Sequence, residues 1–301
     1  MIKILKRGKL KRKKFEGIIF ALPFIIGTLI FYIFPLFISI KLSFGKLKSV
    51  QGFVIQWVGL ANYSKALIID TNFIPMFLSV IQKTIVQGPL IIVFSLLLAL
   101  LINKNIKLKG AFRVIYFIPF LLGTGEVMNK LLGLGLDRQG FAFADSKLLP
   151  REFLVYLGPK VIEAVESFFG IIVVVLWNSG VQMLLFLSGL QSIPISLYES
   201  AKVDGGSEWE MFWKITLPLM SPIMLLNIVY TIITFFTDIS NPIVTYTQDI
   251  AFRKLNFEYA AAIGWIYFLF IILLVMAVFF AFRNNIRTSS QSGGVKENER
   301  Y

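Results

Sequence analysis

Acidic, amide and aromatic side chains gather at two places in this sequence, inside stretches that are otherwise apolar. The residues with polar groups or aromatic faces at these places are Trp177, Asn178, Gln182, Asn227, Tyr230, Phe235, Asp238 and Asn241. Amide and carboxylate groups can hydrogen-bond to hydroxyl groups while an aromatic ring stacks on a sugar ring, so this combination suits a carbohydrate. A site built from such buried groups also discriminates between solutes, because a missing hydroxyl leaves its partner unpaired.

Each of these residues also has a purely structural interpretation. Amides and hydroxyls in apolar helices commonly bind neighbouring helices together, and this alternative stays open for every residue taken singly. A further polar pair, Glu126 and Lys130, has the i,i+4 spacing and the acid-first order that favour an ion pair within one helix. We interpret that pair as structural, and for the cluster Asp238–Asn241 it is the family resemblance described below that favours a solute contact.

Several kinds of chemistry are excluded by what the sequence lacks. It contains no cysteine and no histidine, so disulfides, thiol catalysis and histidine-ligated metals are ruled out. No G-x-x-x-x-G-K-[ST] motif occurs, so the chain carries no nucleotide site of the Walker type. We therefore expect neither a cofactor nor a metal, and an enzyme is disfavoured. The net charge of +13 raises nucleic acid as a ligand, but the distribution of the basic residues favours a membrane surface.

Apolar segments dominate the chain. Of its 301 residues 56% are hydrophobic, which is more than a soluble domain of this size can cover. Six segments reach the roughly 20 apolar residues that a membrane-spanning helix needs: Gly17–Ile40, Met76–Ile102, Phe112–Gly135, Val165–Leu190, Leu219–Val244 and Tyr259–Phe282. The first is too long for the core of a signal peptide and lacks a matching cleavage site, so we expect it to be retained. The sequence predicts an all-α polytopic membrane protein with six transmembrane helices in residues 17–283.

Basic residues favour one orientation of these spans. Residues 1–16, the loop Asn103–Ala111 and the tail after Phe282 are all rich in Lys and Arg, and such segments stay in the cytoplasm. Both termini are therefore predicted inside, with disorder expected for residues 284–301. The longer loops Lys41–Pro75 and Leu136–Ala164 are then outside, and we expect short surface helices in them, as in Pro159–Glu166.

The polar segment Ser196–Pro218 interrupts the apolar stretches on the predicted cytoplasmic side. Ser196 and Glu199 have the spacing of a capping box, which predicts the start of a short helix. That helix can run only to about Asp204, because Gly205 and Gly206 favour a turn. Large aromatic residues then recur at helical spacing up to Pro218. We expect a helix–turn–helix unit at the membrane surface and refer to residues 196–218 as the bracket.

The bracket resembles the EAA loop of the permease subunits of binding-protein-dependent ABC importers. The residues that match the family pattern are Glu199, Ala201, Asp204, Gly205, Phe212, Ile215, Leu217 and Pro218, while Ser200 and Gly206 depart from it by exchange of one small residue for another. The resemblance implies the type I importer fold and a coupling helix that docks on a cytoplasmic ATPase, the partner that binds ATP. It implies that Glu199, Ser200, Ala201, Asp204, Gly205 and Gly206 take part in that coupling.

The segments Trp57–Tyr63 and Trp265–Phe268 are similar to segments of the carbohydrate-uptake class of these importers. That resemblance implies a solute path in the fourth to sixth helices, a heterodimer with a second permease, an extracytoplasmic solute-binding protein as donor, and location in the bacterial cell membrane. Two alternatives remain. One is an ABC importer for phosphate, amino acids or metals, which shares the EAA loop. The other is a secondary transporter, which would have no use for an ATPase-docking loop and usually shows intramembrane repeats.

Overall fold

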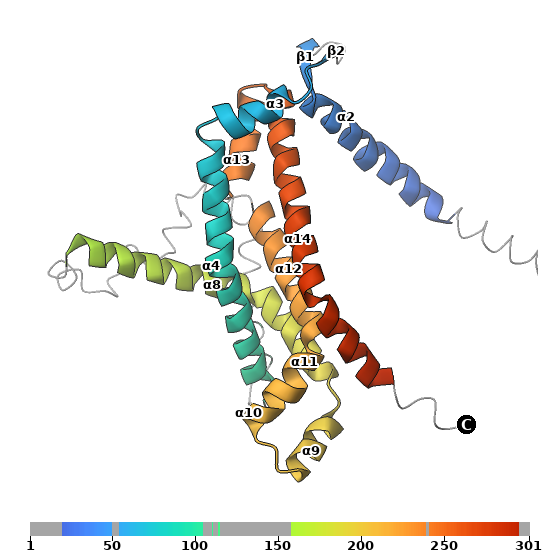
Figure 1. Ribbon diagram of the computed structural model, residues 1–301, viewed down its shortest axis with the longest axis vertical. Helices are drawn as coiled ribbons and strands as arrows, with labels where there is room; N and C mark the ends of the chain where they lie inside the picture. Colours follow the sequence, from blue (N-terminus) through green and yellow to red (C-terminus); the bar gives the residue numbers. More distant parts are fainter. Residues whose placement is uncertain are drawn as a thin grey trace, which may run out of the picture. The chain divides into compact units, whose positions relative to one another are not determined.

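The computed structural model describes residues 20–49, 54–104, 110, 114, 158–238 and 241–294, and Figure 1 shows its elements. The chain forms two compact units. The first combines residues 1–76 with 242–270, and the second combines residues 77–241 with 271–301. Two helices, α4 (Phe73–Asn103) and α14 (Phe257–Gly294), pass from one unit into the other.

The first unit begins with a helix over Phe20–Ser43. A π-helical turn, η1 (Leu29–Ile33), lies in it just before Pro35, because proline cannot donate a regular helical hydrogen bond and the ladder widens locally. The last part is α2 (Phe34–Ser43). Two antiparallel strands follow, β1 (Gly45–Ser49) and β2 (Val54–Trp57), with Leu47 opposite Ile55. The sequence predicts only short helices in this loop, so the hairpin corrects that expectation.

Short helical elements complete the first unit. They are α3 (Ala61–Ser64), the π-helical turn η2 (Lys65–Ile69), α13 (Pro242–Gln248) and a second π-helical turn, η5 (Asp249–Arg253). The Asn62 amide donates to the carbonyls of Ser43 (3.1 Å) and Gly45 (2.9 Å), which holds α3 against the hairpin.

The second unit has its hydrophobic core where α4 meets α8 (Pro159–Ser192) and the elements after it. Ala99, Met183 and Phe186 are fully buried there, and Met220 joins them from the chain that follows the bracket. The Ser95 hydroxyl lies between α4 and α8 and donates to the carbonyls of Ile91 (2.6 Å) and, more weakly, Ser179 (3.3 Å).

Four helices in the described part of the chain are long and apolar enough to span a membrane: Phe20–Ser43, Phe73–Asn103, Val174–Ser192 and Phe257–Arg283. By length and composition they correspond to the predicted first, second, fourth and sixth spans. The predicted third span, with Glu126 and Lys130, lies outside the described residues. Two smaller expectations differ from the structure. The segment Pro159–Glu166 is the beginning of α8 rather than a separate surface helix, and α14 continues as helix to Gly294, because extending an existing helix is far easier than starting one.

The predicted fifth span, Leu219–Val244, is not one continuous helix. Its main part is α12 (Ser221–Thr237), and the helical segment Glu208–Leu219 before it is bent from it by 67°. Pro222 in the first turn of α12 contributes to that bend, because it cannot donate into a continuous ladder. At the other end α12 stops at Asp238, whose ψ of 135° is extended, and Pro242 starts α13.

Candidate functional site

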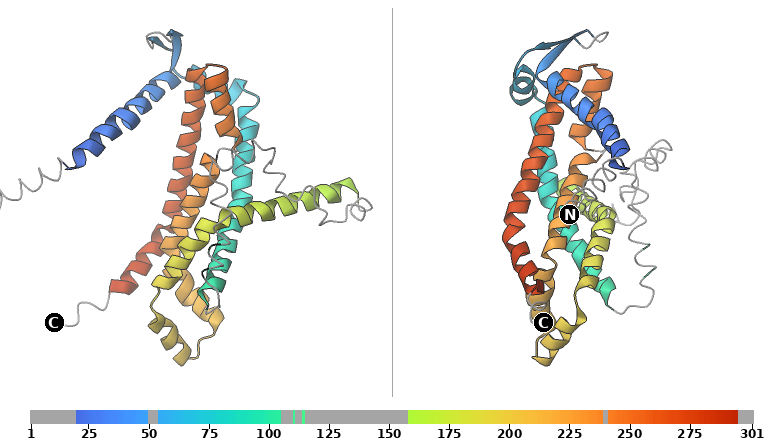
Figure 2. Two further views of the ribbon diagram at one scale, coloured as in Figure 1. Left: turned by 180° about the vertical axis from the view of Figure 1, so that it is seen from behind. Right: turned by 90° about the vertical axis from the view of Figure 1, so that its right-hand side faces the viewer.

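The bracket consists of α9 (Ile195–Val203) and a second arm made of α10 (Glu208–Met211), the π-helical turn η4 (Phe212–Thr216) and α11 (Leu217–Leu219). Figure 1 and both views of Figure 2 place the two arms at one end of α8 and α12. The helix–turn–helix unit predicted from the sequence is therefore present in the second unit.

The turn between the two arms is a Schellman motif at the end of α9. The N–H of Gly205 donates to the carbonyl of Lys202 (3.1 Å) and the N–H of Gly206 to that of Ala201 (2.8 Å), which is the paired pattern of that motif. Gly205 has φ +79°, a conformation that costs other residues about 1–2 kcal/mol. A Cβ on Gly206 would lie 2.9 Å from the Ala201 carbonyl oxygen. Both glycines are therefore needed for this turn.

The capping box predicted for Ser196 and Glu199 is wrong. α9 begins at Ile195 with Pro194 as its N-cap, and no side chain caps it. Ser196 is thus already within the first turn, because proline, with its fixed φ, occupies the extended position that precedes the helix. The Glu199 carboxylate is exposed and makes no hydrogen bond or ion pair with the described residues.

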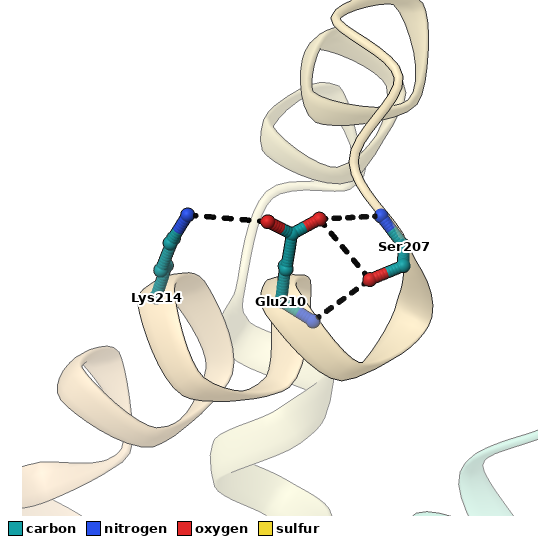
Figure 3. A network of polar contacts seen from close by, with 3 residues as sticks. All are labelled: Ser207, Glu210 and Lys214. Carbon is teal, nitrogen blue, oxygen red and sulfur yellow. Dashed lines mark hydrogen bonds and ion pairs between the residues drawn. The ribbon is translucent and has the colours of Figure 1, made fainter.

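The same spacing of Ser and Glu recurs at Ser207 and Glu210, and there the capping box forms (Figure 3). The N–H of Ser207 donates to Glu210 Oε2 (3.1 Å), the N–H of Glu210 donates to Ser207 Oγ (3.3 Å), and Lys214 Nζ lies 3.4 Å from Glu210 Oε1. The hydrogen bonds from Ser207, followed by that from Lys214, hold the pKa of Glu210 below its usual value. Glu210 therefore fixes the start of the second arm.

Side-chain contacts join the two arms and anchor them to the core. The hydroxyls of Tyr198 and Thr216 are 2.9 Å apart, which links α9 to η4. Met211 is buried, and Tyr198 and Phe212 pack against the core of the second unit. The bracket therefore shares one packed core with α8 and α12.

The outer surface of the bracket carries exposed apolar and charged side chains. Val203 is 88% exposed and Trp209 69% exposed, and Glu199, Lys202 and Asp204 are exposed as well. The coupling role predicted for Glu199, Asp204 and their neighbours stays a prediction.

Buried polar groups form a second candidate region between α8 and α12, which we name the polar seam: Gln182, Asn227 and Thr231. Gln182 Nε2 donates to Thr231 Oγ1 (3.2 Å), and Asn227 Nδ2 donates to the carbonyl of Ile223 (3.2 Å). Gln182 is 1% exposed and Asn227 0% exposed. Yet Gln182 Oε1 and Asn227 Oδ1 have no hydrogen-bond partner among the described residues. Each such acceptor costs about 1–3 kcal/mol, so the seam holds hydrogen-bonding capacity that the described residues do not use.

The other residues predicted for the solute path have more local contacts. Asn241 caps the broken end of α12, since its Nδ2 donates to the Phe235 carbonyl (3.0 Å) and its N–H to the Asp238 carbonyl (2.9 Å). Asn178 Nδ2 donates to the Val174 carbonyl one turn earlier (3.0 Å). Trp177, Tyr230, Phe235 and Asp238 are half-buried. Their part in a solute path stays a prediction.

Sequence reasoning missed one polar cluster and misplaced one cap. Asp70 bonds to Tyr246 and Tyr259 in the first unit, and their separation along the chain left no readable signal. A signal did exist for the capping box at Ser207 and Glu210, which have the same spacing as the pair that the sequence suggests.

Comparisons with known proteins cover nearly the whole chain. The probable ABC transporter permease protein YesP of Bacillus subtilis (strain 168) is 28% identical over 294 residues, which are 91% of this chain and 92% of that protein. The multiple sugar-binding transport system permease protein MsmF of Streptococcus mutans is 29% identical, with coverage of 88% and 93%. No family model matches.

A solved structure shares the fold. A chain of the bacterial alginate ABC transporter, in complex with alginate pentasaccharide-bound periplasmic protein, has a TM-score of 0.65 at 21% identity and covers 93% of this chain and 97% of that one. Along almost its whole length this chain is similar to permease proteins of ABC transporters. It is thus a membrane protein with the predominantly helical fold of ABC importer permeases, and a permease subunit is not itself an enzyme.

Proposed function

We propose that this ABC transporter permease forms half of the translocation pore of an ATP-driven importer of sugars or oligosaccharides. The observation that carries the proposal is the set of relatives that match along almost the whole chain, among them the arabinooligosaccharides transport system permease protein AraP of Bacillus subtilis (strain 168), 27% identical with coverage of 88% and 87%. The polar seam supports it, because unpaired amide oxygens between two helices can accept hydrogen bonds from sugar hydroxyls.

The bracket is the proposed coupling element. Its exposed residues Val203 and Trp209 fit an apolar groove on a cytoplasmic ATPase, and Glu199 supplies an exposed charge for a cationic group there. ATP is bound by that ATPase dimer. The Schellman turn and the bond between Tyr198 and Thr216 keep the two arms as one body, so that closure of the ATPase moves α8 and α12 together.

The remaining partners are a second, different permease and an extracytoplasmic solute-binding protein. The basic residues flanking the predicted spans support a bacterial cell-membrane orientation with both termini in the cytoplasm. In that orientation the bracket faces the ATPase and the β-hairpin of the first unit faces the binding protein's side.

Uptake by the reconstituted complex tests this proposal. The four components are placed in proteoliposomes, and radiolabelled uptake and ATP hydrolysis are measured with oligosaccharides, amino acids and phosphate. Uptake of an oligosaccharide that requires ATP is the expected result. ATP-driven uptake of phosphate or an amino acid alone would assign another importer class, and uptake driven by an ion gradient without ATP would contradict an ABC importer.

A further inference from the structure

Asp70 organises a polar cluster in the first unit, just before α4. Its Oδ1 accepts the backbone N–H groups of Asn72 (2.9 Å) and Phe73 (3.3 Å), and its Oδ2 accepts the hydroxyls of Tyr246 (2.6 Å) and Tyr259. An ionised carboxylate has about four acceptor positions. These four bonds therefore use its capacity, and Asp70 acts to hold the two tyrosine rings in place.

The protonation states follow from these bonds. Burial alone would raise the pKa of Asp70, but the bonds from Tyr246, Tyr259 and the two backbone amides outweigh it, and the pKa lies below its usual value. Burial, together with the bond to Asp70, raises the pKa of Tyr246 to about 12. At neutral pH the carboxylate is ionised and Tyr246 is a neutral donor.

Two lysines lie against these rings: Lys65 has no ion pair among the described residues, and Lys254 has only a long one, to Asp249. Lys65 Nζ lies 4.4 Å from the centroid of the Tyr259 ring, and Lys254 Nζ lies 5.8 Å from that of Tyr246. In the described part of the chain no carboxylate forms an ion pair with Lys65. The nearest carboxylate to Lys254 is that of Asp249, 3.9 Å away and more closely paired with Arg253 at 3.2 Å. The cluster therefore presents two ammonium groups.

A pocket of about 310 Å³ lies between these groups and is lined by Lys65, Asp70, Tyr246, Lys254 and Tyr259 among others. That volume is at the lower end of the roughly 300–1,000 Å³ of ligand sites, so the pocket suits a small group rather than an oligosaccharide. A neutral sugar needs acceptors as well as donors, and the one lining carboxylate is already fully bonded. The charges favour an anion.

Exposed apolar side chains lie on both sides of the lysines. They are Leu67, Ile68 and Ile69 in η2, and Phe252 and Leu255 on either side of Lys254. Leu255 has φ +53°, the only positive φ of a non-glycine residue in the described ranges, and such a conformation persists only where its surroundings impose it.

The position of the pocket explains this combination. All of its lining residues except Tyr259 precede Phe73 or Phe257, the first residues of two candidate membrane-spanning helices, and Tyr259 lies in the first turn of the second. The lysines therefore stand at the level of the lipid headgroups. Cationic groups attract anionic headgroups there, and neighbouring apolar side chains enter the boundary of the acyl chains.

We propose that this pocket binds the phosphate of an anionic phospholipid, with Lys65 and Lys254 as the cationic contacts and the flanking apolar side chains against the upper acyl chains. The tyrosines, fixed by Asp70, orient the two ammonium groups through their ring faces. In the predicted orientation the lipid belongs to the outer leaflet. The site is independent of the solute that the importer carries.

Native mass spectrometry of the purified full chain in detergent tests the proposal. Titration with dioleoylphosphatidylglycerol and, separately, dioleoylphosphatidylcholine compares an anionic with a zwitterionic lipid. The wild type should bind phosphatidylglycerol more tightly. The double variant Lys65→Gln/Lys254→Gln should lose on the order of tenfold in that affinity, while Lys65→Arg/Lys254→Arg, which keeps both charges, should retain it.

The matched control removes the same charge elsewhere in the first unit, by Lys46→Gln/Lys48→Gln on β1, where both lysines are exposed. This variant should bind phosphatidylglycerol like the wild type. An equal loss in the control, or no loss in the pocket variant, would overturn the proposal. Displacement of the lipid by excess inorganic phosphate would also overturn it, because the pocket would then serve a soluble phosphate.

Discussion

Glu199 carries a negative charge that no described side chain neutralises, whereas Glu210, also in the bracket, is occupied by its capping box. The two residues are chemically identical and differ only in these contacts. Variants at the two positions therefore distinguish a carboxylate that contacts a partner from one that only stabilises the local fold.

We predict that Glu199→Gln weakens assembly with the ATPase on the order of tenfold, since a charge-assisted hydrogen bond is worth about 1.5–3 kcal/mol. Glu210→Gln should be nearly silent, because glutamine also serves in a capping box. Co-purification of the ATPase and solute-stimulated ATP hydrolysis measure both variants. Wild-type assembly in Glu199→Gln would leave this carboxylate without a coupling role.

The Asp70 cluster allows a prediction about pH. Asp70→Asn loses the acceptor of several charged hydrogen bonds, and we expect the free energy of unfolding to fall by about 1–2 kcal/mol at pH 7, allowing for partial exposure. The folded pKa of Asp70 lies below the unfolded value, so its contribution is present above the unfolded pKa of about 3.9 and is lost as the pH falls through the folded pKa.

Thermal unfolding of the purified chain at a series of pH values checks this. The difference in Tm between wild type and Asp70→Asn should be largest near neutral pH and shrink below about pH 4. Asp204→Asn is the control, because Asp204 is exposed and its carboxylate makes no ion pair with the described residues. A difference that persists unchanged in acid would mean that the charge of Asp70 is not what stabilises the cluster.

Between α8 and α12, the buried amide oxygens of the polar seam lower the free energy of unfolding but leave hydrogen-bond acceptors for a solute. Replacing Asn227 by leucine removes a buried acceptor that has no partner among the described residues, so we predict that Asn227→Leu raises the free energy of unfolding by about 1 kcal/mol while it lowers solute uptake. Thr231→Val should act in the opposite direction on stability, because Gln182 then loses its hydrogen bond to α12. Thermal unfolding and proteoliposome uptake measure the two effects. Lower stability with normal uptake in Asn227→Leu would make the seam structural.

Membrane spans were the elements that the sequence predicted best, because apolar length alone decides them. Both ends of α4 and the start of α14 lie within a few residues of the predicted spans, whereas α14 continues well beyond the predicted end. The break at Asp238 was harder to place, since the fifth apolar run continues across it, while Pro242 and the Asn241 side chain, which bonds to the Phe235 carbonyl, account for where α12 stops. Hydropathy cannot register such a cap.

In the candidate site, too, some features were predictable from the sequence and others depend on contacts that form only in the fold. The turn at Gly205 and Gly206 was predictable, because few residues besides glycine tolerate its conformation. The start of α9 was not, since Pro194 takes the N-cap position and Ser196 therefore lies inside the first turn, while the equally spaced pair Ser207 and Glu210 caps the next helix. Two residues of the seam, Gln182 and Asn227, are among the residues predicted for the solute path, but Thr231 is not. Its hydrogen bond with Gln182 depends on how α8 packs on α12.

For the whole molecule, the orientation in the membrane determines which ends of the helices face the cytoplasm. The basic segments and the bracket give the same answer from independent properties, charge and resemblance. The absence of cysteine from the sequence makes the orientation directly measurable, because any introduced cysteine is the only thiol in the chain.

Three single variants are sufficient for the measurement. Lys46→Cys on β1 and Val203→Cys at the end of α9 place a thiol at exposed positions, and Ala262→Cys places one at a fully buried position in α14. A membrane-impermeant maleimide should label Lys46→Cys in right-side-out vesicles and Val203→Cys only in inside-out vesicles, when the ATPase is not co-expressed and cannot cover the bracket. Ala262→Cys should react in neither preparation. Labelling of Val203→Cys from the outside would place the bracket on the wrong side for an ATPase and would contradict both the orientation and the coupling role proposed for Glu199 and its neighbours.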